Sequence, residues 1–111
     1  MIFGYCRVSR PSQRIERQIT NITRIYPDAI IIKEIHTRTS MDGRKEWAKL
    51  MRKVRAGDVL VFDSVSRMSG NEEEGFNEYK RLFEMGVELE FLNEPTINTS
   101  LLRDAQKHQI A

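Results

Sequence analysis

Four short apolar runs alternate with amphipathic segments along this chain of 111 residues, and the alternation limits the folds open to it. The runs cover residues 2–8, 29–36, 59–65 and 87–92. Apolar runs of this length, bounded by polar or turn-forming residues, are typical of buried strands. Strands that alternate with helices favour a parallel sheet covered by helices. We therefore expect an α/β fold, with a mostly parallel sheet of about four strands and helices on both faces.

The helices between these runs are predicted from the spacing of apolar residues and from their start and stop signals. The first is expected over residues 11–26, with a proline in its first turn, where proline is tolerated. A second is centred on residues 47–54, and a glycine follows it. The strongest signal is Asn71, an N-cap residue followed by three glutamates, in a helix that Gly86 ends. A short last helix is expected from residue 101.

Length and composition indicate one globular domain in a reducing compartment. Apolar residues make up 40% of the chain and charged residues 31%, which is ordinary for a globular protein. A single cysteine, Cys6, excludes an internal disulfide and favours the cytoplasm. No stretch approaches the roughly 18 apolar residues of a membrane span. Met1 leads directly into the first strand, so we expect no signal peptide.

Charge is distributed unevenly along the chain. Residues 1–70 hold 14 lysines and arginines against 7 acidic residues, whereas residues 71–111 hold 4 against 9. Arginine supplies 12 of the 18 basic groups, and its guanidinium matches phosphate oxygens in bidentate geometry. An arginine-rich basic half favours a phosphate-bearing partner. The alternative is that these charges are simply scattered over a solvated surface.

Polar side chains follow each of the first three predicted strands. Ser9 follows the first strand, Arg38 and Arg44 follow the second, and Ser66 and Arg67 follow the third. Because the carboxyl ends of parallel strands meet at one edge of a sheet, we expect these groups to lie close together. The alternative is that each one decorates its own loop in water.

The first of these groups belongs to a run in which Tyr5, Arg7 and Ser9 alternate along the strand. Side chains at i and i+2 share a face, so these three are expected to point the same way. A guanidinium inside a strand is costly to desolvate unless an anion meets it. A hydroxyl flanked by Arg7 and Arg10 therefore suits chemistry on a phosphate, although Ser9 is equally placed to cap a following helix.

The motif Tyr-x-Arg-Val-Ser near the N-terminus resembles the catalytic domain of serine recombinases, the resolvase/invertase family, and the resemblance extends over nearly the whole chain. It implies a site-specific DNA recombinase in which Ser9 attacks a DNA phosphate and forms a 5′-phosphoserine link. Arg7, Arg44 and Arg67 match the family's catalytic arginines. The resemblance implies neither a metal nor any other cofactor.

The resemblance also implies further contacts and partners. The residues that it places against DNA are Tyr5, Arg10, Gln13, Gln18, Arg38 and Ser66. Residues 1–100 correspond to the catalytic domain, and residues 101–111 to the start of a C-terminal helix, with the DNA-binding region absent. The expected partners are DNA and a second copy of the chain, as a homodimer that assembles into a tetramer during strand exchange.

Two positions depart from the family pattern. Ser66 stands where many members have aspartate, and Gly70 stands where the family normally has a second arginine. Losing that guanidinium removes one phosphate contact, so a noncatalytic DNA-binding or self-associating regulator is an open alternative. A small-molecule binder that uses the same sheet edge is a third reading. The chain has no nucleophile elbow of serine hydrolases, no glycine-rich nucleotide fingerprint, and too few cysteines and histidines for a zinc site.

Overall fold

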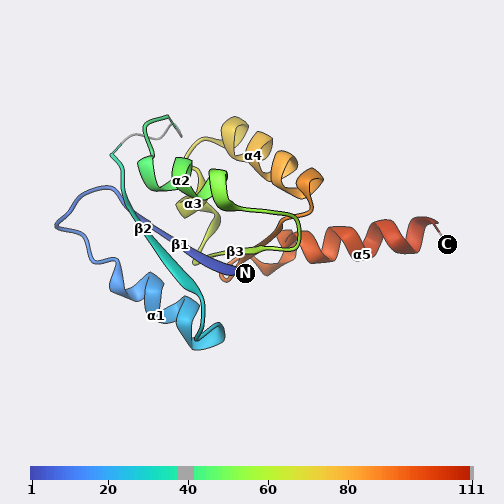
Figure 1. Ribbon diagram of the computed structural model, residues 1–111, viewed down its shortest axis with the longest axis horizontal. Coiled ribbons are helices and arrows are strands. Elements are labelled where there is room, and N and C mark those ends of the chain that lie inside the picture. Colours follow the sequence, from blue (N-terminus) through green and yellow to red (C-terminus); the bar gives the residue numbers. More distant parts are fainter. Residues whose placement is uncertain (38–41, 111) are drawn as a thin grey trace.

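The four predicted strands form one sheet in the computed structural model, which describes residues 1–37 and 42–110 (Figure 1). The strands lie in the order β2-β1-β3-β4, and every neighbouring pair is parallel. Their bounds are β1 Ile2–Val8, β2 Ile30–Ile35, β3 Val59–Phe62 and β4 Glu88–Phe91. The predicted α/β class is therefore confirmed, and the sheet is wholly rather than mostly parallel.

Helices cover both faces of this sheet, as predicted (Figure 1). Helix α1 packs on one face, α2, α3 and α4 lie on the other, and α5 extends away from the body of the domain. Their bounds are α1 Glu16–Ile25, α2 Lys45–Lys53, α3 Val65–Met68, α4 Glu72–Met85 and α5 Thr99–Ile110, with a 3-10 turn at Pro95–Ile97. None of the described helices is long and apolar enough to cross a membrane.

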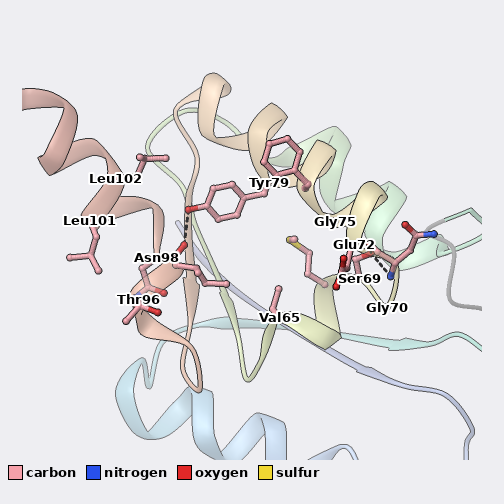
Figure 2. A pocket seen from close by; sticks show the side chains of 14 residues that line it. Val65, Ser69, Gly70, Glu72, Gly75, Tyr79, Thr96, Asn98, Leu101 and Leu102 are labelled. Atoms are coloured by element: carbon pink, nitrogen blue, oxygen red, sulfur yellow. Dashed lines mark hydrogen bonds between the residues drawn. The ribbon is translucent and has the colours of Figure 1, made fainter. Parts of the chain in front are cut away.

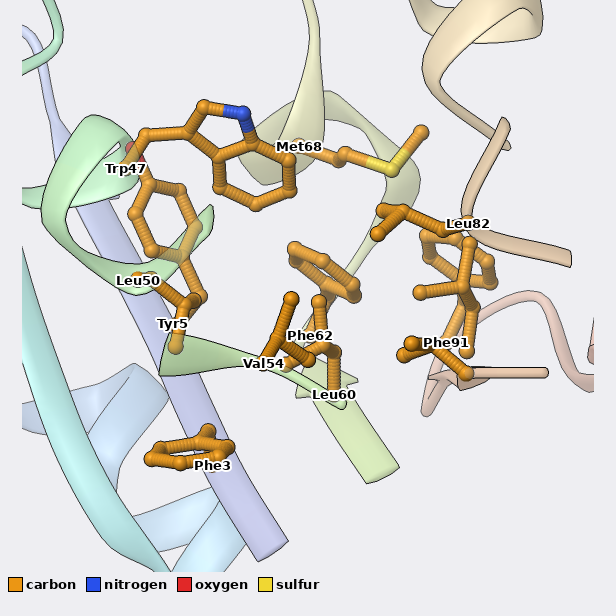
Figure 3. Packing of buried hydrophobic residues seen from close by; sticks show 12 residues of the cluster. Phe3, Tyr5, Trp47, Leu50, Val54, Leu60, Phe62, Met68, Leu82 and Phe91 are labelled. Atoms are coloured by element: carbon orange, nitrogen blue, oxygen red, sulfur yellow. The ribbon is translucent and has the colours of Figure 1, made fainter. Parts of the chain in front are cut away.

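Two apolar clusters hold these layers together, one on each face of the sheet. The larger cluster, between the sheet and α2 and α4, is rich in aromatic rings (Figure 3). Tyr5 meets Trp47 edge to face with ring centroids 5.0 Å apart, and Phe62 stacks on Phe91 at 5.1 Å. Cys6 belongs to the smaller cluster, on the α1 side. Neighbouring residues of β1 therefore point to opposite faces, as the pleat of a strand requires.

The first helix is shorter than predicted, because residues 11–15 lie outside it. Helix α1 begins at Glu16, with Ile15 as its N-cap. The chain before it turns on Gln13, whose amide donates to the carbonyl of Arg10 at 3.0 Å. The side-chain carbonyl of Gln13 accepts the amides of Ser9 at 2.7 Å and Arg10 at 3.1 Å. Ser9 therefore does not cap the helix, which removes the structural alternative for its hydroxyl.

Helix α3 was not predicted: the third strand was expected to continue to residue 65, and no element was assigned between it and Asn71. That strand ends at Phe62, and the helix begins three residues later. The amide of Val65, in its first turn, donates to Oε1 of Glu94 at 2.9 Å. The N-cap residue, Ser64, makes no capping hydrogen bond with its side chain. A carboxylate 29 positions away accepts a first-turn amide instead, and no local pattern carries that signal.

The signals at the ends of α4 are confirmed. The Asn71 side chain accepts the amide of Glu74 at 3.1 Å, and Gly86 ends the helix with a left-handed φ of 88°. The last helix begins at Thr99, two residues earlier than expected. Its buried hydroxyl accepts the amide of Leu89 at 2.7 Å and so fixes the start of α5 against β4.

Candidate active site

The structure brings three arginines together at the carboxyl edge of the sheet. We call Arg7, Arg44 and Arg67 the arginine cluster. Arg7 is the penultimate residue of β1, Arg44 is the N-cap of α2, and Arg67 lies in α3, which follows β3. Arg7 and Arg44 are buried, with only 8% and 2% of their surface exposed, and Arg67 is half-buried. Groups up to 60 positions apart thus meet at one site.

Within the described part of the chain, the three guanidinium groups donate to backbone carbonyls and not to carboxylates. Arg7 Nη2 donates to the carbonyl of Ser66 at 2.8 Å, and its Nε to that of Arg67 at 3.3 Å. Arg44 Nη1 donates to the carbonyl of Met68. Arg67 Nη1 donates in return to the carbonyl of Arg7 at 3.4 Å. Most carbonyls of a four-residue helix lack partners within the helix, so these side chains satisfy the end of α3.

Local backbone geometry directs Arg44 into the cluster. Gly43, immediately before it, has a φ of 85°, a left-handed conformation that other residues rarely adopt. Arg44 itself is extended, and its side chain makes no capping hydrogen bond to α2. Glu34 on β2 supplies that cap instead, since its carboxylate accepts the amides of Glu46 at 3.2 Å and Trp47 at 2.9 Å.

Among the described residues, no direct ion pair neutralises the positive charge of the arginine cluster. Within residues 1–37 and 42–110, no salt bridge within 4.0 Å involves any of the three guanidinium groups. Burial, and next the charge of Arg44, lower the pKa of Arg7. In the same described part of the chain, Arg44 Nε, Arg44 Nη2 and Arg67 Nε are buried without a hydrogen-bond partner. Excess charge and free buried donors together fit an anion.

Ser9 lies directly beyond the end of β1, two residues after Arg7, and is half-buried. Its amide is held by the Gln13 side chain. Its hydroxyl makes no hydrogen bond to any residue that the structure describes. The backbone at Ser9 is therefore tied down while its hydroxyl is left available.

Two residues that were expected to contact DNA, Tyr5 and Gln18, are buried. Tyr5 is fully buried, and its hydroxyl donates to Oε1 of Glu34 at 3.1 Å. Burial, and then the charge of Glu34, raise the pKa of Tyr5. Gln18 is buried as well, and its side chain bonds both the amide and the carbonyl of Arg7, at 3.0 and 2.9 Å. In this arrangement the Tyr5 hydroxyl is held by Glu34 and the Gln18 side chain by the backbone of Arg7, so both side chains are engaged below the arginine cluster.

The remaining predicted contacts are exposed, with one exception outside the described residues. Arg10 and Gln13 are exposed on the turn after Ser9. Ser66 is exposed on α3, and its hydroxyl lies 2.9 Å from that of Ser64. Arg38 falls among residues 38–41, which lie outside the described part of the chain.

Sequence reasoning did not single out Glu34, which links Tyr5, β2 and α2 at the base of the site. It is 4% exposed and is the register partner of Arg7 on the neighbouring strand. The available signal was a carboxylate at a buried position of a strand, because such a group needs hydrogen-bond donors around it.

A separate apolar groove runs between α3, α4 and α5 (Figure 2). Its volume is about 650 Å³. Gly70 and Ser69 lie toward one end and Leu101 and Leu102 toward the other. Phe76, on α4, lines the same groove and is 65% exposed. Gly70, where the family normally has a second arginine, therefore lies toward one end of this groove, next to α3.

Comparisons with known proteins agree with this architecture. The family model described as "Resolvase, N terminal domain" matches residues 2–110. Transposon Tn501 resolvase of Pseudomonas aeruginosa is 31% identical over 98 residues, which are 86% of this chain and 49% of that protein. Serine recombinase PinR of Escherichia coli (strain K12) is 27% identical over 95 residues, or 82% of this chain and 48% of PinR. The chain thus spans about half the length of these curated relatives.

Solved structures share the fold at lower sequence identity. The N-terminal catalytic domain of TP901-1 integrase aligns with a TM-score of 0.72 at 19% identity, covering 89% of this chain and 81% of that one. The C-terminal catalytic domain of ISC1926 TnpA, an IS607-like serine recombinase, aligns with a TM-score of 0.64 at 24% identity, covering 82% and 66%. With the family match over residues 2–110, these findings show that the chain belongs to the serine recombinase family and has the fold of its resolvase-type catalytic domain.

Proposed function

We propose that this domain cleaves and rejoins DNA through a covalent link to Ser9. The observation that carries the proposal is the arginine cluster, in which Arg7 and Arg44 are buried and Arg67 is half-buried, with free N–H donors and no carboxylate partner among the described residues. A phosphodiester is an anion, and guanidinium is its best-matched ligand in proteins. We expect the reaction to take place in the cytoplasm, where DNA is available and Cys6 stays reduced.

In the proposed reaction, Ser9 Oγ attacks the phosphorus of a DNA phosphodiester. A bond forms between Oγ and phosphorus while the serine hydroxyl gives up its proton. The bond to the 3′ oxygen breaks, and that oxygen takes up a proton and leaves as a hydroxyl, so no net proton is gained or lost. Rejoining reverses these steps, so the energy of the phosphodiester bond is retained in the phosphoserine link. Negative charge grows on the non-bridging oxygens in the transition state, where preorganised donors stabilise it most. Arg7, Arg44 and Arg67 are the donors that we assign to this task.

A nicked duplex tests this proposal, because cleavage opposite a nick is difficult to reverse and the covalent product accumulates. The target site is unknown, so the substrate is a pool of nicked duplexes with randomised sequence. We expect protein–DNA adducts that resist denaturants. Mass spectrometry of the digested adduct should find the nucleotide on Ser9. Ser9→Ala should abolish the adduct, whereas Ser12→Ala, on the same exposed turn, should leave it unchanged. An adduct that persists in Ser9→Ala would remove Ser9 from its role.

Gly70 favours a second candidate function, a noncatalytic DNA-binding regulator. It is exposed beside the short helix that carries Arg67, and it has no side chain with which to contact a phosphate. This reading predicts salt-dependent DNA binding without adducts in the wild type. Comparison with Gly70→Arg separates the two readings, because adducts that appear only in Gly70→Arg favour the regulator. Equal adduct yields from the two proteins favour the enzyme.

We also propose that a second copy of the chain covers the apolar groove, as expected for a recombinase that works as a dimer and then a tetramer. Large exposed apolar side chains on two neighbouring helices support this, since monomers rarely leave them uncovered. Phe76→Lys should lower the dimer fraction in sedimentation experiments. Ile35 is also a large exposed apolar residue, but it lies on β2 at the edge of the sheet, so Ile35→Lys should leave the dimer fraction unchanged. A dimer that is unaffected by Phe76→Lys would place the interface elsewhere.

A further inference from the structure

Helix α2 begins with a residue that cannot cap it. Arg44 is the N-cap, and a guanidinium has donors only, so it has no acceptor for the first amides of the helix. The amides at the second and third helical positions belong to Glu46 and Trp47. They are the groups that an N-cap side chain normally binds. A helix that places arginine at this position therefore needs an acceptor from elsewhere in the fold.

Glu34 provides that acceptor from the neighbouring strand. Its Oε1 accepts the Trp47 amide at 2.9 Å and the Tyr5 hydroxyl at 3.1 Å, while its Oε2 accepts the Glu46 amide at 3.2 Å. Both oxygens are thus engaged by neutral donors. A carboxylate at the N-terminus of a helix is also favoured by the helix dipole.

Arg44 gains from this arrangement because Glu34 does not bind it directly. Among the ion pairs of residues 1–37 and 42–110, none joins Glu34 to Arg44 or to Arg7. The guanidinium of Arg44 instead donates to the carbonyl of Met68, which leaves its Nε and Nη2 without partners among the described residues. A salt bridge from Glu34 would have used these donors.

We infer that Glu34 is a positioning residue that sets Arg44 for anion binding, by capping α2 in place of its arginine N-cap while leaving the Arg44 guanidinium free. The consequence for DNA cleavage rests on the proposed function, whereas the consequence for anion binding does not. Glutamine at this position keeps the shape but has one acceptor oxygen, and its NH₂ group faces an amide donor. Arg44 should then lose its fixed position.

The test measures sulfate binding to the DNA-free domain by NMR, using the side-chain N–H signals of the arginines. Glu34→Gln is expected to weaken sulfate binding at least tenfold. Glu46→Gln is the matched control, because it removes a half-exposed carboxylate from the first turn of the same helix. The sulfate affinity of this control should stay within twofold of the wild-type value. Urea unfolding verifies that each variant is folded. If Glu34→Gln does not fold, Glu34→Asp takes its place and is likewise expected to weaken sulfate binding at least tenfold.

A double-mutant cycle with Arg44→Ala separates positioning from a general structural effect. If Glu34 acts through Arg44, Glu34→Gln should change sulfate affinity less than twofold when Arg44 is already alanine. A folded Glu34 variant that binds sulfate like the wild type overturns the inference. The inference is also overturned if Glu34→Gln lowers sulfate affinity by the same factor with Arg44 present and with Arg44→Ala. Absence of sulfate binding by the wild type also overturns it.

The nicked-DNA assay, run on the same proteins, tests the proposed function separately. Sulfate binding that depends on Glu34 without any DNA adduct supports the positioning role and contradicts the recombinase reaction. Adducts that form equally well in wild type and Glu34→Gln contradict the positioning role and leave the reaction intact.

Discussion

Replacing Tyr5 by phenylalanine tests whether this residue supports the site from below or contacts DNA. The ring is fully buried between Trp47 and Phe62, so phenylalanine preserves the aromatic packing. The change removes only the hydroxyl that donates to Glu34 at 3.1 Å. Hydrogen bonds to charged groups contribute about 1.5–3 kcal/mol, and Glu34 keeps its two amide donors. We therefore expect Tyr5→Phe to lower the free energy of unfolding by about 2 kcal/mol.

Urea unfolding followed by circular dichroism measures this loss. For a small domain the urea dependence is about 1–3 kcal/mol per M, so the midpoint should fall by about 1 M. Tyr79→Phe is the matched control, because its hydroxyl donates to a neutral carbonyl, that of Ile97, at 2.6 Å and at an exposed site. Its cost should not exceed about 1 kcal/mol.

The result that would refute the reasoning is a Tyr5→Phe variant with wild-type stability and weakened DNA binding. That combination would mean that the hydroxyl contacts DNA, in conflict with its burial beside Glu34. Destabilisation with unchanged DNA affinity at temperatures where the variant is folded would support the buried role.

Three further outcomes follow from the fold. Burial raises the pKa of the Cys6 thiol to about 12 from an unfolded value near 9, so the unfolded state loses this proton first and urea-measured stability should fall between pH 9 and 12. Cys6→Ala should reduce that fall. Gly4→Ala should cost about 1–3 kcal/mol, because the added methyl would meet side-chain carbons of Ile22 and Ile31 at 2.9 Å; a neutral effect in thermal melts would contradict this close packing. Asn71→Ala should cost about 1 kcal/mol in urea unfolding through loss of the α4 N-cap, and an unchanged midpoint would refute the cap's contribution.

Local sequence patterns sufficed for the elements whose signals lie within a few residues. The four strands, the N-cap at Asn71 and the glycine at Gly86 were all predicted and are present. The expectation that polar groups gather at the carboxyl edge required only parallel strands, and the structure brings the three arginines together there. The start of α1 was misplaced, because the Gln13 side chain binds the amides of Ser9 and Arg10 in a turn that apolar spacing does not encode.

Contacts between distant segments decided the rest. Helix α3 depends on Glu94, 29 positions from the amide that it caps, and α2 depends on Glu34, 13 positions from Trp47. The burial of Tyr5, likewise, follows from packing against α2, which no pattern within β1 specifies. The sequence by itself determined the order of strands and helices along the chain and the motif that resembles serine recombinases. Only the tertiary structure decided which polar groups face solvent and which support the site, because a buried donor or acceptor must find its partner wherever the fold places one.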